Sequence, residues 1–434
     1  MRNKRVLGNT FRGAGIPALC LIALLLMMTL SSCSLLSKAD EADNKADCVT
    51  ETEGSAEAAD MAAEGSHGIK DSITEPPSRP ENGSGVRAYD PGDRSGNGEP
   101  NVLTGGCWRD HDNWPFFINL VNSGTISFPS FGLDPRHRIK VTVTDESGSP
   151  LRGETLELKD AEGSVIWTAK SGKDGTAYLF YIADDAPAYV TCCGEEIDVS
   201  GEVQETFEDG QGGAAAGARA DYTMTVIPEA PDRNGVQIMF IIDTTGSMSD
   251  ELAFLQKDFS AIAEEVGGSD VYFSTGFYRD EGDEYVTKCN GFTQDVQTVV
   301  SQLGAEYAEG GGDNPEAVAE ILEETMNNSE WREDCSKIAF LIFDAPPHIQ
   351  REASIVKSIK TAAEQEIVIV PVVASNAERD TELFARAAAI LTGGTYVFLT
   401  DDSGVGESHL EPIIGDYQVE LLHDIIVKVI DEYR

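Results

Sequence analysis

Three short stretches of the sequence carry acidic residues whose positions could serve metal chemistry. The apolar run 238–242 ends at Asp243, and two hydroxyl residues, Thr245 and Ser247, follow at the second and fourth positions after Asp243. Asp313 lies in a glycine-rich stretch, "GGGDNPEA", and Asp344 ends a second apolar run, 338–343. Mg²⁺ prefers about six oxygen ligands in an octahedron, several of them water. These five residues therefore predict a Mg²⁺ site, with Mn²⁺ and Ca²⁺ as alternative ions.

The elements that must position these residues alternate between strand and helix from residue 235 onward. Expected strands cover 237–242, 271–277, 285–289, 338–343, 367–373 and 395–399, and apolar stripes at helical spacing cover 252–266 and 417–433. This alternation is typical of an α/β, doubly wound and mostly parallel sheet. Ligands of such sheets bind beyond the carboxyl ends of the strands, which is where Asp243 and Asp344 are expected.

The order of the motifs adds a family resemblance over residues 235–434. Strand, Asp-Thr-Thr-Gly-Ser, helix, glycine-rich loop and a later strand ending in aspartate together resemble a von Willebrand factor type A (vWA) domain with its metal-ion-dependent adhesion site. The resemblance implies that the hydroxyls of Thr245 and Ser247 bind the metal directly and that Asp344 reaches it through water. It also implies that an acidic side chain of a protein partner completes the coordination.

Asp313 departs from the family pattern, which has a threonine on the glycine-rich loop. A third carboxylate is expected to strengthen cation binding and to weaken the pull of the cation on an acidic ligand. The alternative is a helix cap, because Asp313, Pro315 and Glu316 have the spacing of a capping box. One carboxylate has oxygens for both roles, so both interpretations stay open.

Three further residues near these motifs are weaker candidates. Asp280 and Ser249 could lie just outside the ligand shell, although a solvated ion pair with Arg279 and a helix cap are the plainer interpretations of the two. A single histidine on a surface loop, His348, is more often neither a ligand nor a catalyst. The sequence predicts no catalytic residues and therefore no enzyme activity.

The N-terminal segment has the features of an export signal. Residues 1–32 combine a basic start with an apolar run and small residues, and Leu30-Ser31-Ser32-Cys33 resembles the bacterial lipoprotein signal. The resemblance implies lipidation of Cys33 and attachment to the extracytoplasmic face of a bacterial cell membrane. An ordinary secretory signal with an incidental cysteine is the alternative.

Two regions separate this signal from the α/β segment. Residues 33–100 are acidic and poor in large apolar side chains, as in a disordered tether. Residues 101–230 begin with an aromatic extension and continue with alternating strands broken by turn signals, typical of a small β-sandwich of immunoglobulin-like or carboxypeptidase-regulatory-like type. The sandwich could be a binding module, but we favour a spacer because a fold alone names no function.

Charge and cysteine usage limit the partners. A net charge of −43 argues against nucleic-acid binding and against contact with anionic lipid other than through a lipid anchor. Six cysteines follow Cys33, and their pairing is open: Cys48, Cys107, Cys192, Cys193, Cys289 and Cys335. Adjacent positions of a strand point to opposite faces, so Cys192 and Cys193 are not expected to bond to each other.

These features together predict a cell-surface lipoprotein whose metal-binding head recognises a protein through an acidic side chain. The first alternative is an accessory factor that couples the metal-binding head to an envelope enzyme or assembly machine. A structural envelope component whose metal only stabilises the fold is the second.

Overall fold

The computed structural model describes residues 102–128, 131–201, 221–312, 314–328, 330–403 and 408–434. The chain divides into two units, 1–80 and 81–434, and every described residue belongs to the second. The expected signal peptide, Cys33 and tether lie outside the described residues and stay predictions. No helix among the described residues is long and apolar enough to cross a membrane.

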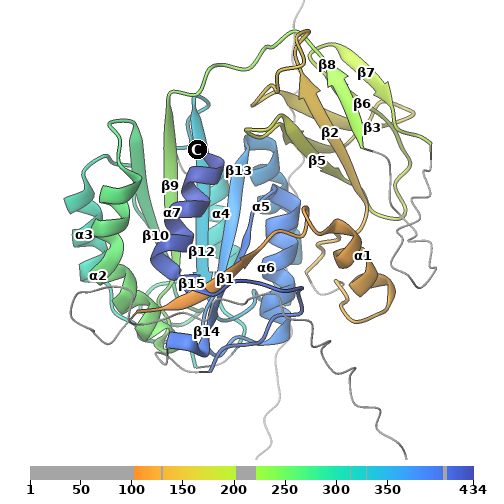
Figure 1. Ribbon diagram of the computed structural model, residues 1–434. Coiled ribbons are helices and arrows are strands. Elements are labelled where there is room, and N and C mark those ends of the chain that lie inside the picture. The colour runs from red at the N-terminus through yellow and green to blue at the C-terminus, as the bar shows by residue number, and fades with distance from the viewer. Residues whose placement is uncertain (1–101, 129–130, 202–220, 313, 329, 404–407) are drawn as a thin grey trace, which may run out of the picture. The chain divides into compact units, whose positions relative to one another are not determined.

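An eight-stranded sheet organises the C-terminal half, in the order β11-β10-β9-β12-β13-β14-β1-β15 (Figure 1). Its five central strands run parallel, and β11 and β1 run antiparallel to their neighbours. The strands are β11 (Thr287–Cys289), β10 (Val271–Tyr278), β9 (Gly235–Asp243), β12 (Cys335–Phe343), β13 (Ile367–Val373), β14 (Tyr396–Thr400), β1 (Thr104–Trp108) and β15 (Glu420–Leu421). The predicted α/β class with a mostly parallel sheet is confirmed.

Alternate side chains of the central strands enter two apolar cores on opposite faces of the sheet, because successive residues of a strand point to opposite sides. Met239 and Ile241 of β9 belong to one core, and Ile238 and Phe240 belong to the other. The first core includes α4 (Val318–Asn328), α5 (Glu352–Gln365) and α6 (Arg379–Thr392), and the second includes α2 (Ser249–Val266), α3 (Val296–Ala305) and α7 (Leu422–Tyr433). Helices on both faces make the sheet doubly wound (Figure 1).

A smaller β-sandwich lies within residues 138–225. One sheet has the order β5-β2-β8 and the other β4-β3-β6-β7. The strands are β2 (Arg138–Thr144), β3 (Thr155–Asp160), β4 (Val165–Lys170), β5 (Thr176–Phe180), β6 (Pro187–Cys192), β7 (Glu195–Asp198) and β8 (Tyr222–Thr225). Fully buried side chains from both sheets, including Val141 and Leu158, form its core.

The segment before the sandwich contributes a strand to the large sheet of the α/β domain. The sequence grouped residues 101–230 into one module, whereas β1 lies in the large sheet between β14 and β15, and α1 (Trp114–Asn122) follows it. Two glycines of β1 approach their neighbours closely: a Cβ on Gly105 would lie 2.5 Å from the carbonyl oxygen of Phe398. The predicted helix 417–433 begins only at Leu422, because residues 420–421 pair with β1 as β15.

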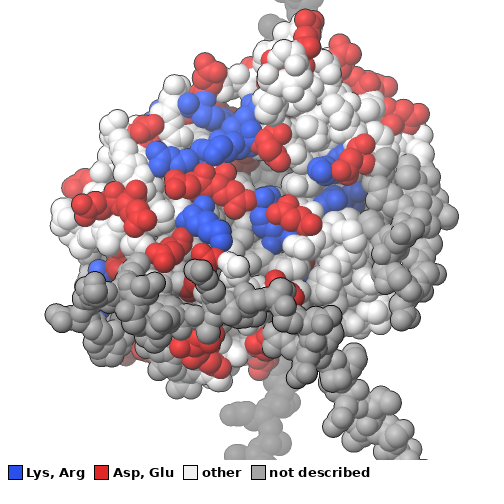
Figure 2. Space-filling model, in the orientation of Figure 1, with Lys and Arg blue, Asp and Glu red and all other residues white. Residues whose placement is uncertain are grey.

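Ion pairs join the sandwich region to the α/β domain. A cavity of about 540 Å³ at this junction is lined by Arg109, Arg152, Lys170 and Lys173 among others. The first three pair with acidic groups: Arg109 with Glu432, Arg152 with Glu366, and Lys170 with Glu333. Figure 2 shows Lys and Arg gathered on part of one face with Asp and Glu between them. Acidic groups therefore compensate much of the positive charge at this cavity.

Candidate metal centre

Asp243 and Asp344 lie at the same edge of the sheet. They end the neighbouring parallel strands β9 and β12, and the register pairs Ile242 with Ile342 just before them. Both carboxylates are buried. Burial and the charge of Asp344 raise the pKa of Asp243, and burial also raises the pKa of Asp344. Parallel pairing of β9 and β12 brings the two carboxylates to one edge of the sheet, as expected from the sequence.

The direct hydrogen bonds to Asp243 are made at Oδ1, while the buried hydroxyl of Tyr278 lies beside the carboxylate and opposes the rise of its pKa. Thr245 donates to Asp243 Oδ1 from its backbone N–H at 2.8 Å and from its hydroxyl at 2.7 Å. Asp243 Oδ2 and Asp344 Oδ1 are both buried without a hydrogen-bond partner. Buried polar atoms are rarely left unpaired, so these two oxygens need an explanation.

Ser247 lies on the short 3₁₀ turn η1 (Gly246–Met248) and is exposed. A hydrogen bond from its side chain lowers the pKa of Asp344, which opposes the larger effect of burial and places the hydroxyl beside that carboxylate. Ser249 is exposed and starts α2, whose cap residue is Met248 without any side-chain cap. The helix-cap interpretation of Ser249 is therefore wrong.

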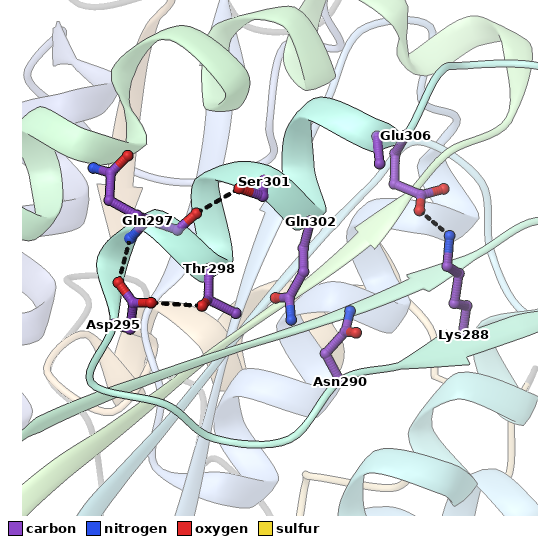
Figure 3. A pocket seen from close by; sticks show the side chains of 9 residues that line it. Lys288, Asn290, Asp295, Gln297, Thr298, Ser301, Gln302 and Glu306 are labelled. Atoms are coloured by element: carbon purple, nitrogen blue, oxygen red, sulfur yellow. Dashed lines mark hydrogen bonds and ion pairs between the residues drawn. The ribbon is translucent and has the colours of Figure 1, made fainter.

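Thr244 points to the other side of the strand end. Its hydroxyl donates to the carbonyl of Tyr278 at 2.9 Å and lies 2.7 Å from the hydroxyl of Tyr285. Tyr285 in turn donates to Glu306, which pairs with Lys288. Glu306 and Lys288 line a polar groove of about 510 Å³ beside α3 (Figure 3). This chain of hydrogen bonds ties the strand end to the loop that follows α3.

The glycine-rich loop lies against Thr245. Gly246 N–H donates to the carbonyl of Gly310 at 3.2 Å, and Gly311 N–H donates to Asp283 at 2.8 Å. A Cβ on Gly311, whose φ is +68°, would lie 2.8 Å from Glu316 Oε1 and 3.1 Å from the Thr245 Cβ. Only glycine fits this approach without displacing a neighbour.

Glu316 is a site residue that the sequence interpretation missed. It is 4% exposed, its backbone N–H donates to the carbonyl of Pro346, and its Oε2 has no partner. Burial and the charges of Asp243, Asp280, Asp344 and Asp283 raise its pKa to about 9. Its burial and its position beside Gly311, next to Thr245, make Glu316 a third buried carboxyl group near Asp243 and Asp344.

The capping box predicted from Asp313 and Glu316 is wrong in one respect. Helix α4 begins at Val318, so Glu316 precedes the helix and points to the carboxylate cluster instead of closing a first turn. Asp313 itself lies outside the described residues. The run "GGGDNPE" includes Glu316, but its spacing of three residues from Asp313 favoured a capping box over a role in the metal centre.

Asp280 pairs with a different residue from the one expected. It is buried, and its Oδ1 lies 2.8 Å from His348 Nε2. Arg279 instead contacts Glu284 and the carbonyl of Tyr307. The predicted Asp280–Arg279 pair is therefore wrong, and His348 links the loop after Asp344 to the end of β10.

The residues present fit a divalent cation. Two buried carboxylate oxygens lack partners, and two hydroxyls lie beside the same carboxylates. The charge of Asp344 raises the pKa of Asp243, and the charge of Glu251 raises the pKa of Asp344. A cation would relieve this repulsion and satisfy both oxygens. Among the described residues no group of three His, Cys, Asp or Glu side chains could hold a metal by itself. The hydroxyls of Thr245 and Ser247 would therefore be needed as ligands.

Comparisons with known proteins address the α/β segment. Residues 237–405 match the family model of the von Willebrand factor A domain. An ariadne-like RING finger protein of Acanthamoeba polyphaga mimivirus is 26% identical over 211 residues, which are 43% of this chain and 20% of that protein. The chain thus matches about a fifth of the length of that relative.

A solved structure, the conserved hypothetical protein BatB from Bacteroides thetaiotaomicron, is 15% identical. The match covers 46% of this chain and 98% of that one, with a TM-score of 0.34. Residues 237–405 are thus similar to a vWA domain, which is in general a protein-interaction module.

Proposed function

We propose that this vWA domain binds a divalent cation at the carboxyl ends of β9 and β12 and recognises a partner protein there. The observation that carries the proposal is the pair of buried, unpartnered oxygens on Asp243 and Asp344. Thr245 and Ser247 would supply neutral oxygens, and Mg²⁺, Mn²⁺ or Ca²⁺ would supply an electrophilic centre for a ligand oxygen. The chemistry is recognition and needs no bond to be broken.

Glu316 shapes the choice of partner. With Asp243 and Asp344 it gives three buried carboxyl groups, and its pKa of about 9 keeps it protonated at neutral pH in the cation-free protein. A cation that lowered this pKa would add the charge of Glu316 to that of the two strand-end aspartates. The cation is then held more firmly, and its attraction for an acidic side chain of a partner falls. We infer that partner capture through a carboxylate requires Glu316 to be protonated or turned away.

The location of the protein is part of the proposal. Lipidation of Cys33 would attach the chain to the extracytoplasmic face of a bacterial membrane, and residues 33–100 would hold the head away from it. Labelled palmitate should enter the parent chain and not Cys33→Ser. Equal labelling of both would exclude a lipid anchor at this cysteine.

Cation binding can be tested by calorimetric titration of the metal-free chain with Mg²⁺, Mn²⁺ and Ca²⁺. Asp344→Asn should weaken binding by roughly tenfold or more, the change expected when about 1.4 kcal/mol of ligand interaction is lost. Asp431→Asn is the matched control, because it removes one charge from the exposed end of α7. Equal affinities of the two variants would exclude this site.

Partner recognition needs a second measurement. Capture of proteins from intact cells by the purified chain should require divalent cation and should fail with Asp344→Asn. Capture that survives chelation would separate recognition from the metal centre and would leave cation binding as the only role of this edge of the sheet.

A further inference from the structure

Two adjacent thiols lie close together in the sandwich, away from the metal centre. Cys192 ends β6, and Cys193 begins the turn to β7. Their Sγ atoms are 3.7 Å apart. Neighbouring side chains of a regular strand would point to opposite faces, so the turn must bring these two together.

The backbone of the turn explains the contact. Cys192 pairs with Glu195, which leaves a two-residue hairpin loop of Cys193 and Gly194. Both loop residues have positive φ, +49° and +81°, as in a type I′ turn. Asn, Asp and Gly favour this conformation, and a cysteine there is uncommon. Leaving the strand conformation rotates the Cys193 side chain toward that of Cys192.

A buried carboxylate connects the thiol pair to the segment that enters the α/β domain. Cys193 Sγ donates to Glu154 Oε2 at 3.0 Å. Glu154 is 2% exposed and also accepts hydrogen bonds from the backbone N–H groups of Glu229 and Ala230. These two residues lie between β8 and β9, so Glu154 anchors the interdomain segment 229–230.

We propose that Cys192 and Cys193 are a vicinal dithiol that closes reversibly to a disulfide, and that closure removes one of the hydrogen bonds positioning Glu154 and so loosens segment 229–230. The oxidant is a small disulfide. The Cys193 sulfur, the more exposed of the two, attacks it and releases one thiol. The Cys192 sulfur then attacks Cys193 Sγ and releases the second thiol, so that two thiol hydrogens leave the protein and one disulfide is reduced.

Chain geometry makes this bond easy to reduce. Neighbouring Cα atoms are about 3.8 Å apart across a trans peptide, below the roughly 4.4 Å at which unstrained disulfides begin. Strained disulfides are the reducible, regulatory kind. Burial raises the pKa of Cys192 to about 11 and also raises that of Cys193, so the reaction should be slow at neutral pH and faster in alkali.

The experiment treats the reduced full chain with oxidised glutathione, followed by alkylation, digestion without reductant and mass spectrometry. The peptide that holds both cysteines should lose two hydrogens, keep no glutathione and return to its original mass with a mild reductant. Cys192→Ser should instead keep glutathione on Cys193, and Cys289→Ser should close as the parent does. A stable glutathione adduct in the parent, or two thiols that stay alkylatable, would overturn the proposal.

Hydrogen exchange tests the second half of the proposal. After closure, the amides of Glu229 and Ala230 should exchange roughly fivefold faster, the change expected for one lost hydrogen bond of ordinary strength. Cys193→Ser keeps a donor for Glu154 and cannot close, so its exchange should not respond to the oxidant. Unchanged exchange in the oxidised parent would show that the dithiol is not coupled to the segment.

Discussion

Asp243 and Asp344 leave adjacent parallel strands at the same edge of the sheet, and each keeps one buried oxygen without a hydrogen-bond partner. The pairing Ile242–Ile342 fixes this relationship through the backbone, one residue before Asp243 and two residues before Asp344. In the cation-free protein the carboxylates of Asp243 and Asp344 therefore repel each other, and neither strand can move away alone because the two are hydrogen-bonded.

Stability of the cation-free protein should fall as pH rises. The folded pKa values of Glu316, Asp243 and Asp344 are raised above their unfolded values. The stability that these three groups contribute is therefore fully present below the unfolded pKa values and is lost as pH rises through the folded ones. For Glu316 the loss should run from about pH 4.5 to about 9.

Urea unfolding of the chelated chain across this range measures the slope. Glu316→Gln should flatten it and should stabilise the cation-free chain at high pH, since an amide cannot ionise. Saturating Mg²⁺ should also flatten the slope in the parent. A parent chain whose stability rises over this range would contradict the raised pKa values of these three buried carboxyl groups.

Gly311→Ala should disturb the metal centre more than its backbone strain alone explains. The new Cβ would meet Glu316 Oε1 at 2.8 Å and Thr245 at 3.1 Å. Gly124→Ala is the matched control, because φ there is +73° against +68° and no atom lies within 4 Å of the added Cβ. Both variants should lose roughly 1–3 kcal/mol of stability from strain, and only Gly311→Ala should also weaken Mg²⁺ binding in the titration.

His423 should stabilise the packing of α7 on α2 below neutral pH. Burial lowers its pKa, but hydrogen bonds to Glu265 and Asp258 raise it more, and the net shift is upward. Its contribution is therefore fully present below about pH 6.5 and is lost as pH rises through the folded pKa.

The glutamate partner of His423 is largely exposed, so solvent screening limits the effect to about 1 kcal/mol or less. Thermal unfolding of parent and His423→Gln at pH 5.5 and pH 8 measures it, and the difference between the two proteins should be larger at pH 5.5. A larger difference at pH 8 would reverse the sign of the assigned shift.

Asp110→Ala should destabilise the whole α/β domain. Asp110 follows β1 and pairs with Arg386 of α6 in full burial, and it also accepts from the indole of Trp108. Removing Asp110 should cost roughly 3 kcal/mol because the buried Arg386 then keeps only the longer contact with Glu382, at 3.4 Å, to compensate its charge.

The double variant Asp110→Ala, Arg386→Met separates this effect from a general packing defect. It should recover part of the lost stability, since no buried guanidinium is left without Asp110 and Glu382, the other carboxylate beside Arg386, keeps its pair with Arg379. Chemical unfolding of the four proteins of this cycle gives the coupling energy. Additive losses would show that β1 is not anchored through this pair.

The sequence by itself determined the parallel strands, the two aspartates that end β9 and β12, and the hydroxyls beside Asp243. Periodicity and strand-ending residues are local signals, and parallel pairing carries them to one edge of the sheet. Only the tertiary structure decided the rest. Glu316 joins the centre because its loop folds back against Pro346, and β1 enters the sheet by pairing with β14 almost 300 residues away. The Cys193 side chain lies beside that of Cys192 because φ of Cys193 is positive. Local periodicity encodes none of these three contacts.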